Sequence, residues 1–325
     1  MITPNPMPAP ATTSAPSDLL RISDLDARQL YVLLDLAAEM KAVPHGWETA
    51  LHGDTVAMFF EKPSTRTRVS FAAACQHLGA LPLGLRPDEL QLGRGEPISD
   101  TARVLSGYSS AIVVRTYAQA VLEEMAAAAD KPVINALTDE HHPCQALADL
   151  LTIRERFGSL QGIRAAYLGD GNNVAHSLME AGALAGMHVV VGTPPGYEPD
   201  PAITDRAAET ALAHGGTIAV VNDPVEAVAG AHAVYTDVWV SMGDDEAQRT
   251  RREQVLRAFQ VDTQLMRRAD REAVFLHCLP AHRGEEVSAD VIDGPASVVF
   301  RQAENRLWTE EAVLYAYIRR VWGDR

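Results

Sequence analysis

The sequence predicts an α/β protein of two domains, each a parallel β-sheet flanked by helices. Three observations lead to this class. The chain has 325 residues, about twice the length of a typical domain. Short apolar segments alternate with amphipathic helical patterns along it. Hydrophobic residues make up 47% and charged residues 22%, so each half can bury a core without disulfides or metals.

Several short apolar segments have the composition of buried strands. They are residues 55–60, 111–115, 132–136, 164–169, 188–191, 217–221, 233–236 and 273–276. Apolar residues at three- and four-residue spacing lie between them and predict helices. The clearest of these helices are 67–78, 100–108, 144–156 and 175–185. Because strands and helices alternate, we expect crossover connections and parallel pairing.

Domain boundaries follow from changes in composition and pattern. Residues 1–17 are rich in Pro, Ala, Ser and Thr without periodicity, and we expect a disordered tail there. A helix ends at Gly158 and a new strand begins near Arg164. The first domain is therefore predicted to span 18–150 and the second domain 151–304.

The last helical pattern lies within 305–325, after the second domain. Apolar residues recur on one side of it, at Leu314, Tyr317, Ile318 and Val321. Such a stripe has to be buried against another element. We expect this helix to return to the first domain and complete it.

Composition disfavours several classes of partner. Asp and Glu number 43 against 28 Lys and Arg, and the net charge of −15 should repel nucleic acid and anionic lipid. Three cysteines are too few for a disulfide framework, which favours a reducing compartment. No apolar run approaches the roughly 18 residues that span a bilayer, and the N-terminus lacks a secretion-signal pattern. The sequence thus predicts a cytoplasmic protein that acts on small molecules.

A cluster of hydroxyl and guanidinium groups opens the helix after the first strand. It contains Ser64, Thr65, Arg66, Thr67 and Arg68. Free backbone N–H groups and the helix dipole attract anions there, and Arg66 can bind phosphate oxygens through two N–H groups. A capped, solvent-exposed helix start explains the hydroxyls equally well. Two arginines in a first turn, where the dipole disfavours cations, instead indicate a bound anion.

Polar side chains also follow the next two strands of the first domain. Arg115 ends one strand, and His142 and Gln145 follow the other. An exposed side chain at a strand end is common when taken alone. Because the carboxyl edge of a parallel sheet is where ligands bind, three such strands together favour an anion-binding crevice.

A glycine-rich turn at 169–173, sequence GDGNN, follows the first predicted strand of the second domain. It resembles a dinucleotide fingerprint, but Val174 stands at the third glycine position and no acidic residue follows the next strand, so nucleotide binding is disfavoured. Asn172 and Asn173 can form a turn or present amide donors to a carboxylate. Asp237 follows the strand 233–236. A carboxylate opposite amides suits an amino-acid zwitterion.

Cys278 follows the last strand and precedes Leu279 and Pro280. A cysteine at such a position is more often packed than catalytic. Residues that could be considered as zinc ligands are His141, His142, Cys144, His277, Cys278 and His282. Because the chain has no CxxC or HExxH motif, we expect no metal site.

From about Leu19 to Ile318 the motifs resemble those of ornithine carbamoyltransferases. The STRTR segment at 64–68 and HPCQ at 142–145 are shared across carbamoyltransferases. The segments DVWVSMG at 237–243 and HCLP at 277–280 resemble the ornithine enzymes specifically, so aspartate transcarbamoylase is disfavoured. The resemblance implies carbamoyl phosphate in the first domain, ornithine in the second, and a homotrimer, or a multiple of trimers, with active sites at subunit boundaries.

The resemblance also implies roles for single residues. The carbamoyl phosphate site would contain Ser64, Thr65, Arg66, Thr67, Arg115, His142, Gln145, Cys278, Leu279 and Arg306. The ornithine site would contain Asn173, Asp237, Ser241 and Met242. The expected catalytic residues are Cys278, Arg115 and Asp237, without a metal or organic cofactor. Ala73 and Gly107 depart from the family pattern, which commonly has Glu and a larger side chain there.

The implied reaction is attack of the neutral δ-amine of ornithine on the carbamoyl carbon, which gives citrulline and phosphate, with arginine biosynthesis as the expected role. Three alternatives remain open at this point. A hydrolase with Cys278 as nucleophile would show ping-pong kinetics. A sensor would bind without turnover. A carbamoyltransferase for putrescine or an acylated ornithine would keep the motifs of the first domain.

Overall fold

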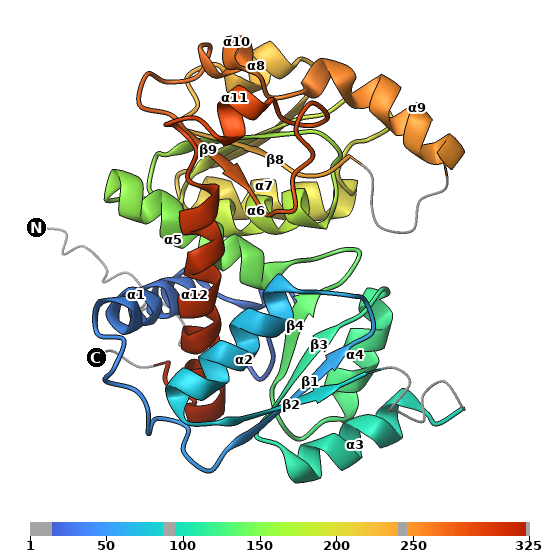
Figure 1. Ribbon diagram of the computed structural model, residues 1–325, viewed down its shortest axis with the longest axis vertical. Helices are drawn as coiled ribbons and strands as arrows, with labels where there is room; N and C mark the ends of the chain where they lie inside the picture. The colour runs from blue at the N-terminus through green and yellow to red at the C-terminus, as the bar shows by residue number, and fades with distance from the viewer. Residues whose placement is uncertain (1–14, 87–94, 240–245, 323–325) are drawn as a thin grey trace, which may run out of the picture.

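The computed structural model describes residues 15–86, 95–239 and 246–322. Almost all of the predicted tail at 1–17, together with Ser241 and Met242, lies outside the described residues. Two parallel sheets flanked by helices lie one above the other in Figure 1, which confirms the predicted fold class. No helix among the described residues is both long and apolar enough to cross a membrane.

The first sheet has four parallel strands in the order β2-β1-β3-β4. Its strands are β1 (Thr55–Phe60), β2 (Leu81–Leu85), β3 (Ala111–Arg115) and β4 (Val133–Leu137). The chain adds β2 on one side of β1 and then β3 on the other. The order therefore reverses between β1 and β3, and ligands bind outside the carboxyl ends of the strands at such a reversal.

Helices cover both faces of the first sheet because its strands alternate in the direction of their side chains. These elements are η1 (Ile22–Asp24), α1 (Ala27–Ala42), α2 (Arg66–Leu78), α3 (Ile98–Tyr108) and α4 (Gln119–Ala128). Val56 and Met58 of β1 belong to the core that includes α1 and α2. Ala57 and Phe59 face the opposite core, which α3 and α4 cover.

The second sheet has five parallel strands in the order β7-β6-β5-β8-β9. Its strands are β5 (Arg164–Leu168), β6 (His188–Gly192), β7 (Thr217–Val221), β8 (Ala233–Thr236) and β9 (Val274–His277). Its helices are α6 (Asn173–Leu184), α7 (Pro201–Ala213), α8 (Pro224–Val228), α9 (Glu246–Leu256), α10 (Thr263–Met266) and α11 (Ala289–Ile292), with the short turn η3 (Arg257–Phe259). The strand order reverses between β5 and β8. The GDGNN turn and Asp237 follow these two strands.

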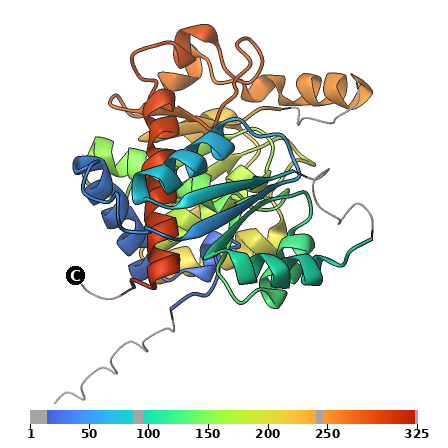
Figure 2. The same cartoon turned by 60° about the horizontal axis from the view of Figure 1, so that its bottom comes forward.

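Two helices connect the sheets. α5 (Pro143–Phe157) spans residue 150, the position of the predicted domain boundary. α12 (Val299–Arg319) begins beside β9 and packs against α1, α2 and α5. In Figures 1 and 2 this red helix runs from the upper sheet down along the lower one. The expected return of the C-terminal helix to the first domain is confirmed, although the helix starts before residue 305.

The strand β2 was not predicted from the sequence. It contains Pro82 and Gly84, residues that are rare in central strands, and it lies at the edge of its sheet. An edge strand needs hydrogen-bond partners on one side only, so the missing N–H of Pro82 costs little. Tertiary position, and not local composition, therefore makes this segment a strand.

Candidate active site

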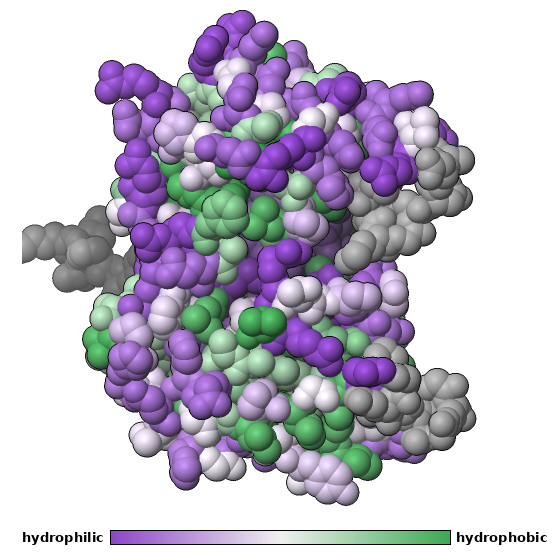
Figure 3. All heavy atoms as spheres, in the orientation of Figure 1, coloured by the Kyte–Doolittle hydropathy of each residue, from purple (hydrophilic) through white to green (hydrophobic). Residues whose placement is uncertain are grey.

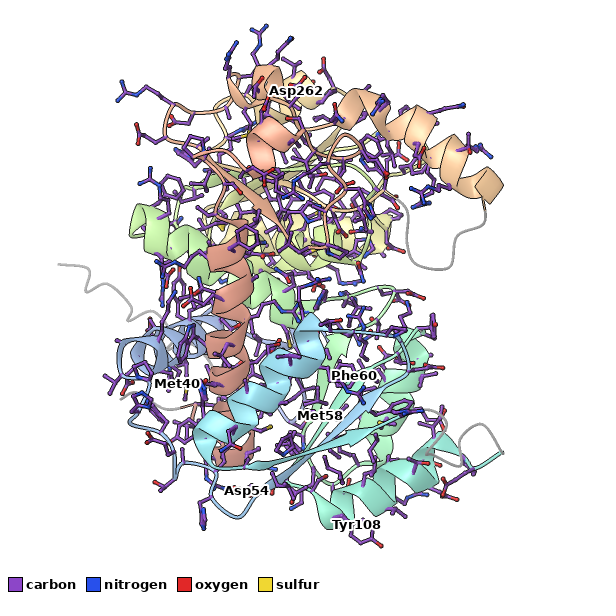
Figure 4. All side chains as sticks on the ribbon, in the orientation of Figure 1. Met40, Asp54, Met58, Phe60, Tyr108 and Asp262 are labelled. Atoms are coloured by element: carbon purple, nitrogen blue, oxygen red, sulfur yellow. The ribbon has the colours of Figure 1, made fainter. Side chains whose placement is uncertain are left out.

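The structure brings the predicted residues of the first domain to one edge of the sheet. β1, β3 and β4 are neighbours, and Arg66, Arg115 and His142 lie at or just beyond their carboxyl ends. Figure 4 labels Phe60 at the end of β1 that points toward the second sheet and Asp54 at the opposite end. The expectation that three successive strands present these side chains to one edge is confirmed.

The helix α2 begins at this edge without a capping hydrogen bond from the side chain of its N-cap residue. Thr65 is its N-cap residue and makes no capping hydrogen bond. Thr65 and Arg66 are exposed, and Ser64 is half-buried. Thr67 is buried and accepts a hydrogen bond from Arg306 of α12. The hydroxyls of Ser64 and Thr65 are thus accessible beside a free helix N-terminus, where an anion is favoured.

Three guanidinium groups lie close enough to perturb one another. Burial, followed by repulsion from Arg306 and Arg66, lowers the pKa of Arg115 to about 10. The pKa of Arg66 is lowered first by partial desolvation of its guanidinium group and then by the charge of Arg306. Glu310 offsets part of this charge, because its Oε1 atom lies 3.3 Å from Nη2 of Arg306. The cluster still carries excess positive charge and suits a multiply charged anion.

His142 lies among these arginines as a neutral imidazole. Its side chain is buried, and burial together with Arg306 and Arg115 holds its pKa well below the usual value. Its backbone N–H donates to Oγ of Ser177 at 2.7 Å, which fixes the start of α5. A neutral ring can donate one hydrogen bond without adding a further positive charge.

Several polar atoms at this edge are buried and have no hydrogen-bond partner among the described residues. They are Nε of Arg115, Nδ1 of His142, Oε1 of Gln145 and Nε of Arg306. Buried polar groups in native proteins are nearly always paired, so a set of unpaired ones at a sheet edge indicates where a ligand makes its contacts. These unpaired atoms include both hydrogen-bond donors and an acceptor. A ligand with a carbonyl oxygen beside an amino group needs both kinds of partner.

A buried network behind this edge contains residues that the sequence did not single out. Asp149 Oδ1 accepts from Nε2 of Gln145 at 2.8 Å and from Nε2 of Gln302 at 2.6 Å. Gln302 Oε1 accepts from the backbone N–H of His277 at 2.9 Å. Burial raises the pKa of Asp149 to about 7. The network joins Gln145 in α5 to the end of β9, and no local motif marks it.

In the second domain, Asp237 and Cys278 meet at the ends of β8 and β9. Sγ of Cys278 donates to Oδ1 of Asp237 at 2.9 Å. Burial, followed by the charge of Asp237, raises the pKa of Cys278 well above its usual value. The group is therefore a thiol at neutral pH. A thiolate nucleophile, which a cysteine hydrolase needs, is disfavoured.

The two asparagines of the GDGNN turn have different contacts. Asn172 caps α6 by accepting from the backbone N–H groups of Val174 and Ala175, and its Nδ2 atom donates to Oδ2 of Asp237 at 3.0 Å. Asn173 donates to the backbone oxygen of Thr138 at 2.6 Å. The family resemblance places Asn173 in the ornithine site. In the structure it is Asn172 that contacts Asp237.

The two sheets face each other across the predicted site. The negative charge of Asp237 reaches Arg66 and favours its protonated form. Leu279 lies in the left-handed region at φ 59, and its N–H donates to Nδ1 of His277 at 2.8 Å. This tight turn follows β9 at its carboxyl end. Figure 3 shows the surface recessed and polar between the upper and lower halves.

The histidines and cysteines that were named as possible zinc ligands do not form one cluster in the described part of the chain. His141 lies 3.6 Å from Glu180, and Cys144 donates to the backbone oxygen of Asn135. Two other groups have ligand atoms within 4.8 Å of one another. One is Asp237, His277 and Cys278; the other is His282, Glu285 and Glu286.

Comparisons with known proteins assign both parts of the chain. Residues 17–155 match the carbamoyl-P binding domain of the aspartate/ornithine carbamoyltransferases, and residues 161–317 match their Asp/Orn binding domain. The chain belongs to this family. It is 52% identical over 305 residues to the ornithine carbamoyltransferase of Symbiobacterium thermophilum, which covers 93% of this chain and 98% of the relative.

A curated sequence and a solved structure from Pyrococcus furiosus extend the family comparison. The anabolic ornithine carbamoyltransferase of that organism is 51% identical over 302 residues, with 91% of this chain and 95% of the relative covered. A solved structure of its ornithine carbamoyltransferase superposes with a TM-score of 0.89 at 50% identity and covers 92% of this chain and 96% of that chain. The carbamoyltransferase fold thus extends over both sheets and α12.

Proposed function

We propose that this protein transfers the carbamoyl group of carbamoyl phosphate to the δ-amine of L-ornithine. The δ-nitrogen forms a bond to the carbamoyl carbon, and the bond from that carbon to the bridging phosphate oxygen breaks. The nitrogen loses one proton, so the products are citrulline and inorganic phosphate. The observation that carries the proposal is the set of unpaired buried polar atoms beside three arginines, in a chain whose relatives are ornithine carbamoyltransferases.

The phosphate group has a suitable place at the start of α2. Ser64, Thr65 and Thr67 supply hydroxyls there, and the helix N-terminus supplies N–H groups and positive potential. Arg66 adds a charge-assisted contact, and Arg306 holds the buried Thr67 from α12. These groups favour the dianion that leaves in the reaction.

The carbamoyl group has matching partners deeper in the site. Arg115 and the neutral His142 can donate to the carbonyl oxygen, where negative charge develops during attack. Gln145 is held by Asp149 and keeps Oε1 free to accept from the carbamoyl NH₂ group. Leu279 and Cys278 close the site from the second domain, at the turn after β9. Positioning of both substrates supplies the rest of the rate enhancement.

Ornithine is proposed to bind along the second domain. Asp237 is fixed by Cys278 and Asn172 and offers a carboxylate to the α-ammonium group of the amino acid. Asn173, Ser241 and Met242 complete the proposed pocket by resemblance. The proposed domain division, 18–150 with the C-terminal helix and 151–304, gives each substrate its own sheet. Domain closure would then bring the amine to the carbamoyl carbon.

A homotrimer, a cytoplasmic location and a role in arginine biosynthesis belong to the same proposal. Apolar side chains on the first domain support an assembly surface, because Leu81 of β2 and Tyr108 of α3 are 62% and 75% exposed. Figure 3 shows hydrophobic side chains gathered over this lower half. Free thiols at Cys75, Cys144 and Cys278 suit a reducing compartment. The anabolic name of the Pyrococcus furiosus relative supports the biosynthetic direction.

A citrulline assay with a panel of amines tests the proposal. Purified protein is incubated with carbamoyl phosphate and ornithine, putrescine, N-acetylornithine or aspartate, and both phosphate and the carbamoylated product are measured. We expect turnover with ornithine and at least 100-fold less with the other acceptors. An acceptor that does not match the pocket leaves buried polar groups of the protein without partners, and this penalty imposes such selectivity. Phosphate release at equal rate without any amine, or preferred use of another amine, contradicts the proposal.

A further inference from the structure

A second group of polar side chains lies just beyond the active-site turn, on the loop that follows β9. It consists of His282, Glu285 and Glu286. The loop bends so that Nδ1 of His282 lies 3.7 Å from Oε2 of Glu285 and 3.9 Å from Oε2 of Glu286. We call these three residues the loop cluster. Its three facing atoms come from three side chains within five positions of the chain.

The spacing of the loop cluster suits a metal ion better than direct contacts. Distances of 3.7 and 3.9 Å are too long for hydrogen bonds. A divalent cation that lies about 2.0–2.2 Å from each ligand in tetrahedral geometry sets neighbouring ligand atoms roughly 3.3–3.6 Å apart. Movements of a few tenths of an ångström in the half-exposed His282 would therefore complete the coordination.

Glu286 supplies an independent indication that a cation is bound. Its side chain is 0% exposed, and within the part of the chain that the structure describes Oε2 has no hydrogen-bond partner, although it points toward His282. Oε1 accepts from the backbone N–H of His282 at 2.5 Å and faces Nε2 of His277 at 3.2 Å. Within the described ranges no Lys or Arg nitrogen lies within 4.0 Å of this carboxylate. A buried carboxylate needs a cation or a full set of donors.

Glu285 also has one carboxylate oxygen with a partner and one that faces His282. It lies on a more open side of the loop. Oε1 lies 3.2 Å from Nη2 of Arg249, whereas Oε2 is buried, has no hydrogen-bond partner in the described ranges and is turned to His282. A cavity of about 490 Å³ opens beside Glu285, between α9 and the loop, with Trp239 and Arg257 among its lining residues. An ion therefore has a route to the loop cluster from solvent.

We propose that His282, Glu285 and Glu286 bind one divalent transition-metal cation through Nδ1 and the two Oε2 atoms. One imidazole and two carboxylates suit zinc or cobalt(II), and the two carboxylates neutralise the charge of the ion. The ion is not a reactant in carbamoyl transfer. It pairs the buried Glu286 and, through Oε1 of that residue, steadies His277 and the turn that carries Cys278.

The test is a cobalt(II) titration of the full-length protein, followed by calorimetry and by absorption spectroscopy. His282→Ala and Glu285→Gln remove one ligand each from half-exposed positions, so the fold should survive. His45→Ala is the matched control, because Nδ1 of His45 lies 3.6 Å from Glu48 at the same three-residue spacing, and no third ligand joins this pair among the described residues. Cys278→Ser reports on the competing group Asp237, His277 and Cys278.

We expect one cobalt ion per chain, d–d absorption without a thiolate-to-cobalt charge-transfer band, and binding that is unchanged in His45→Ala and Cys278→Ser. The affinity should fall at least tenfold in His282→Ala and in Glu285→Gln. Absence of binding, unchanged affinity in both variants, or a thiolate band that disappears in Cys278→Ser would overturn the assignment. Ornithine turnover is scored separately, so failure of the metal site and failure of the proposed activity are distinguishable.

Discussion

The thiol of Cys278 lies 2.9 Å from Oδ1 of Asp237, at the point where the second sheet faces the arginines of the first. A thiol that donates to a carboxylate orients that carboxylate and is a poor nucleophile. This contact makes Cys278 a group that positions Asp237 and, through it, the ornithine that we propose binds there. The kinetics of cysteine variants follow from this arrangement.

Cys278→Ser should impair ornithine use only moderately, since a hydroxyl can also donate to Asp237. Cys278→Ala removes the donor, and we expect a further rise in KM for ornithine of about tenfold, the equivalent of about 1.4 kcal/mol for one charge-assisted hydrogen bond. Steady-state kinetics measure both variants. Complete loss of turnover in Cys278→Ser, with a carbamoyl-thioester trapped on the unaltered protein, would favour covalent catalysis instead.

Arg66→Ala should weaken carbamoyl phosphate binding tenfold or more, because it removes a charge-assisted contact of about 1.5–3 kcal/mol. Calorimetry with the intact dianion measures the effect, and circular dichroism checks the fold. Arg68→Ala is the control from the same turn, as Arg68 packs over the ring of Phe60 at 5.8 Å. Equal losses in the two variants would remove Arg66 from the phosphate site.

At the scale of elements, α12 determines whether the two sheets act as one site. It begins beside β9, passes α5 and α2, and carries Gln302 and Arg306 on its buried side. Gln302 joins Asp149 of α5 to the backbone of His277, and Arg306 joins α12 to Thr67 of α2. A helix that bridges the sheets can thus position residues of both substrate sites.

Gln302→Leu should destabilise the protein by about 1–3 kcal/mol, because it removes one donor to the buried Asp149 carboxylate and leaves the N–H of His277 without its acceptor. Urea unfolding measures this free energy. Arg301→Ala, an exposed neighbour on the same helix, should change it by less than about 0.5 kcal/mol. A loss for Gln302→Leu no larger than that of the control would show that the bridge contributes nothing.

At the scale of the whole molecule, buried carboxyl groups make stability depend on pH. Burial raises the pKa of Asp149 to about 7, of Glu310 to about 7 and of Glu311 to about 8. The folded protein therefore holds protons that the unfolded chain has lost above about pH 4.5. The contribution of these three groups to the free energy of unfolding is therefore greatest below about pH 4.5. It falls as the pH rises toward 8.

Glu311→Gln should flatten this dependence. Each group contributes a slope of at most about −1.4 kcal/mol per pH unit between its unfolded and folded pKa values, and Gln has no proton to lose. Chemical unfolding at pH 5, 6, 7 and 8 measures the slope. Glu304→Gln, an exposed position on the same helix, serves as control. An unchanged slope for Glu311→Gln would show that Glu311 titrates normally in the folded protein.

Closure of the two domains should also set the pH dependence of activity. The δ-amine of ornithine has a reference pKa near that of lysine, about 10.4, so little of it is neutral in solution. Arginines around carbamoyl phosphate and loss of water on closure both favour the neutral amine. We expect kcat/KM for ornithine to rise from about pH 6 to pH 8, and carbamoyl phosphate to bind first. A flat profile, or tight ornithine binding to the free protein, contradicts this order.

Local sequence determined most of the secondary structure and the pieces of the site. Apolar segments such as 55–60, 111–115 and 217–221 became strands with the predicted bounds, because buried parallel strands need continuous apolar runs. The turn at 64–68, which we propose binds phosphate, was likewise visible, since its chemistry depends on neighbours in the chain.

Tertiary structure alone decided how these pieces meet. The network of Asp149 and Gln302 and the pairing of Asn172 with Asp237 join residues 153 and 65 positions apart, so no local pattern could reveal them. The strand β2 exists because it lies at a sheet edge, and the loop cluster exists because the chain bends back after β9. The sequence by itself therefore determined the kind of chemistry this protein carries, because that depends on side-chain type and local backbone. Packing of distant segments decided which atoms face one another, because burial and pairing depend on contacts across the fold.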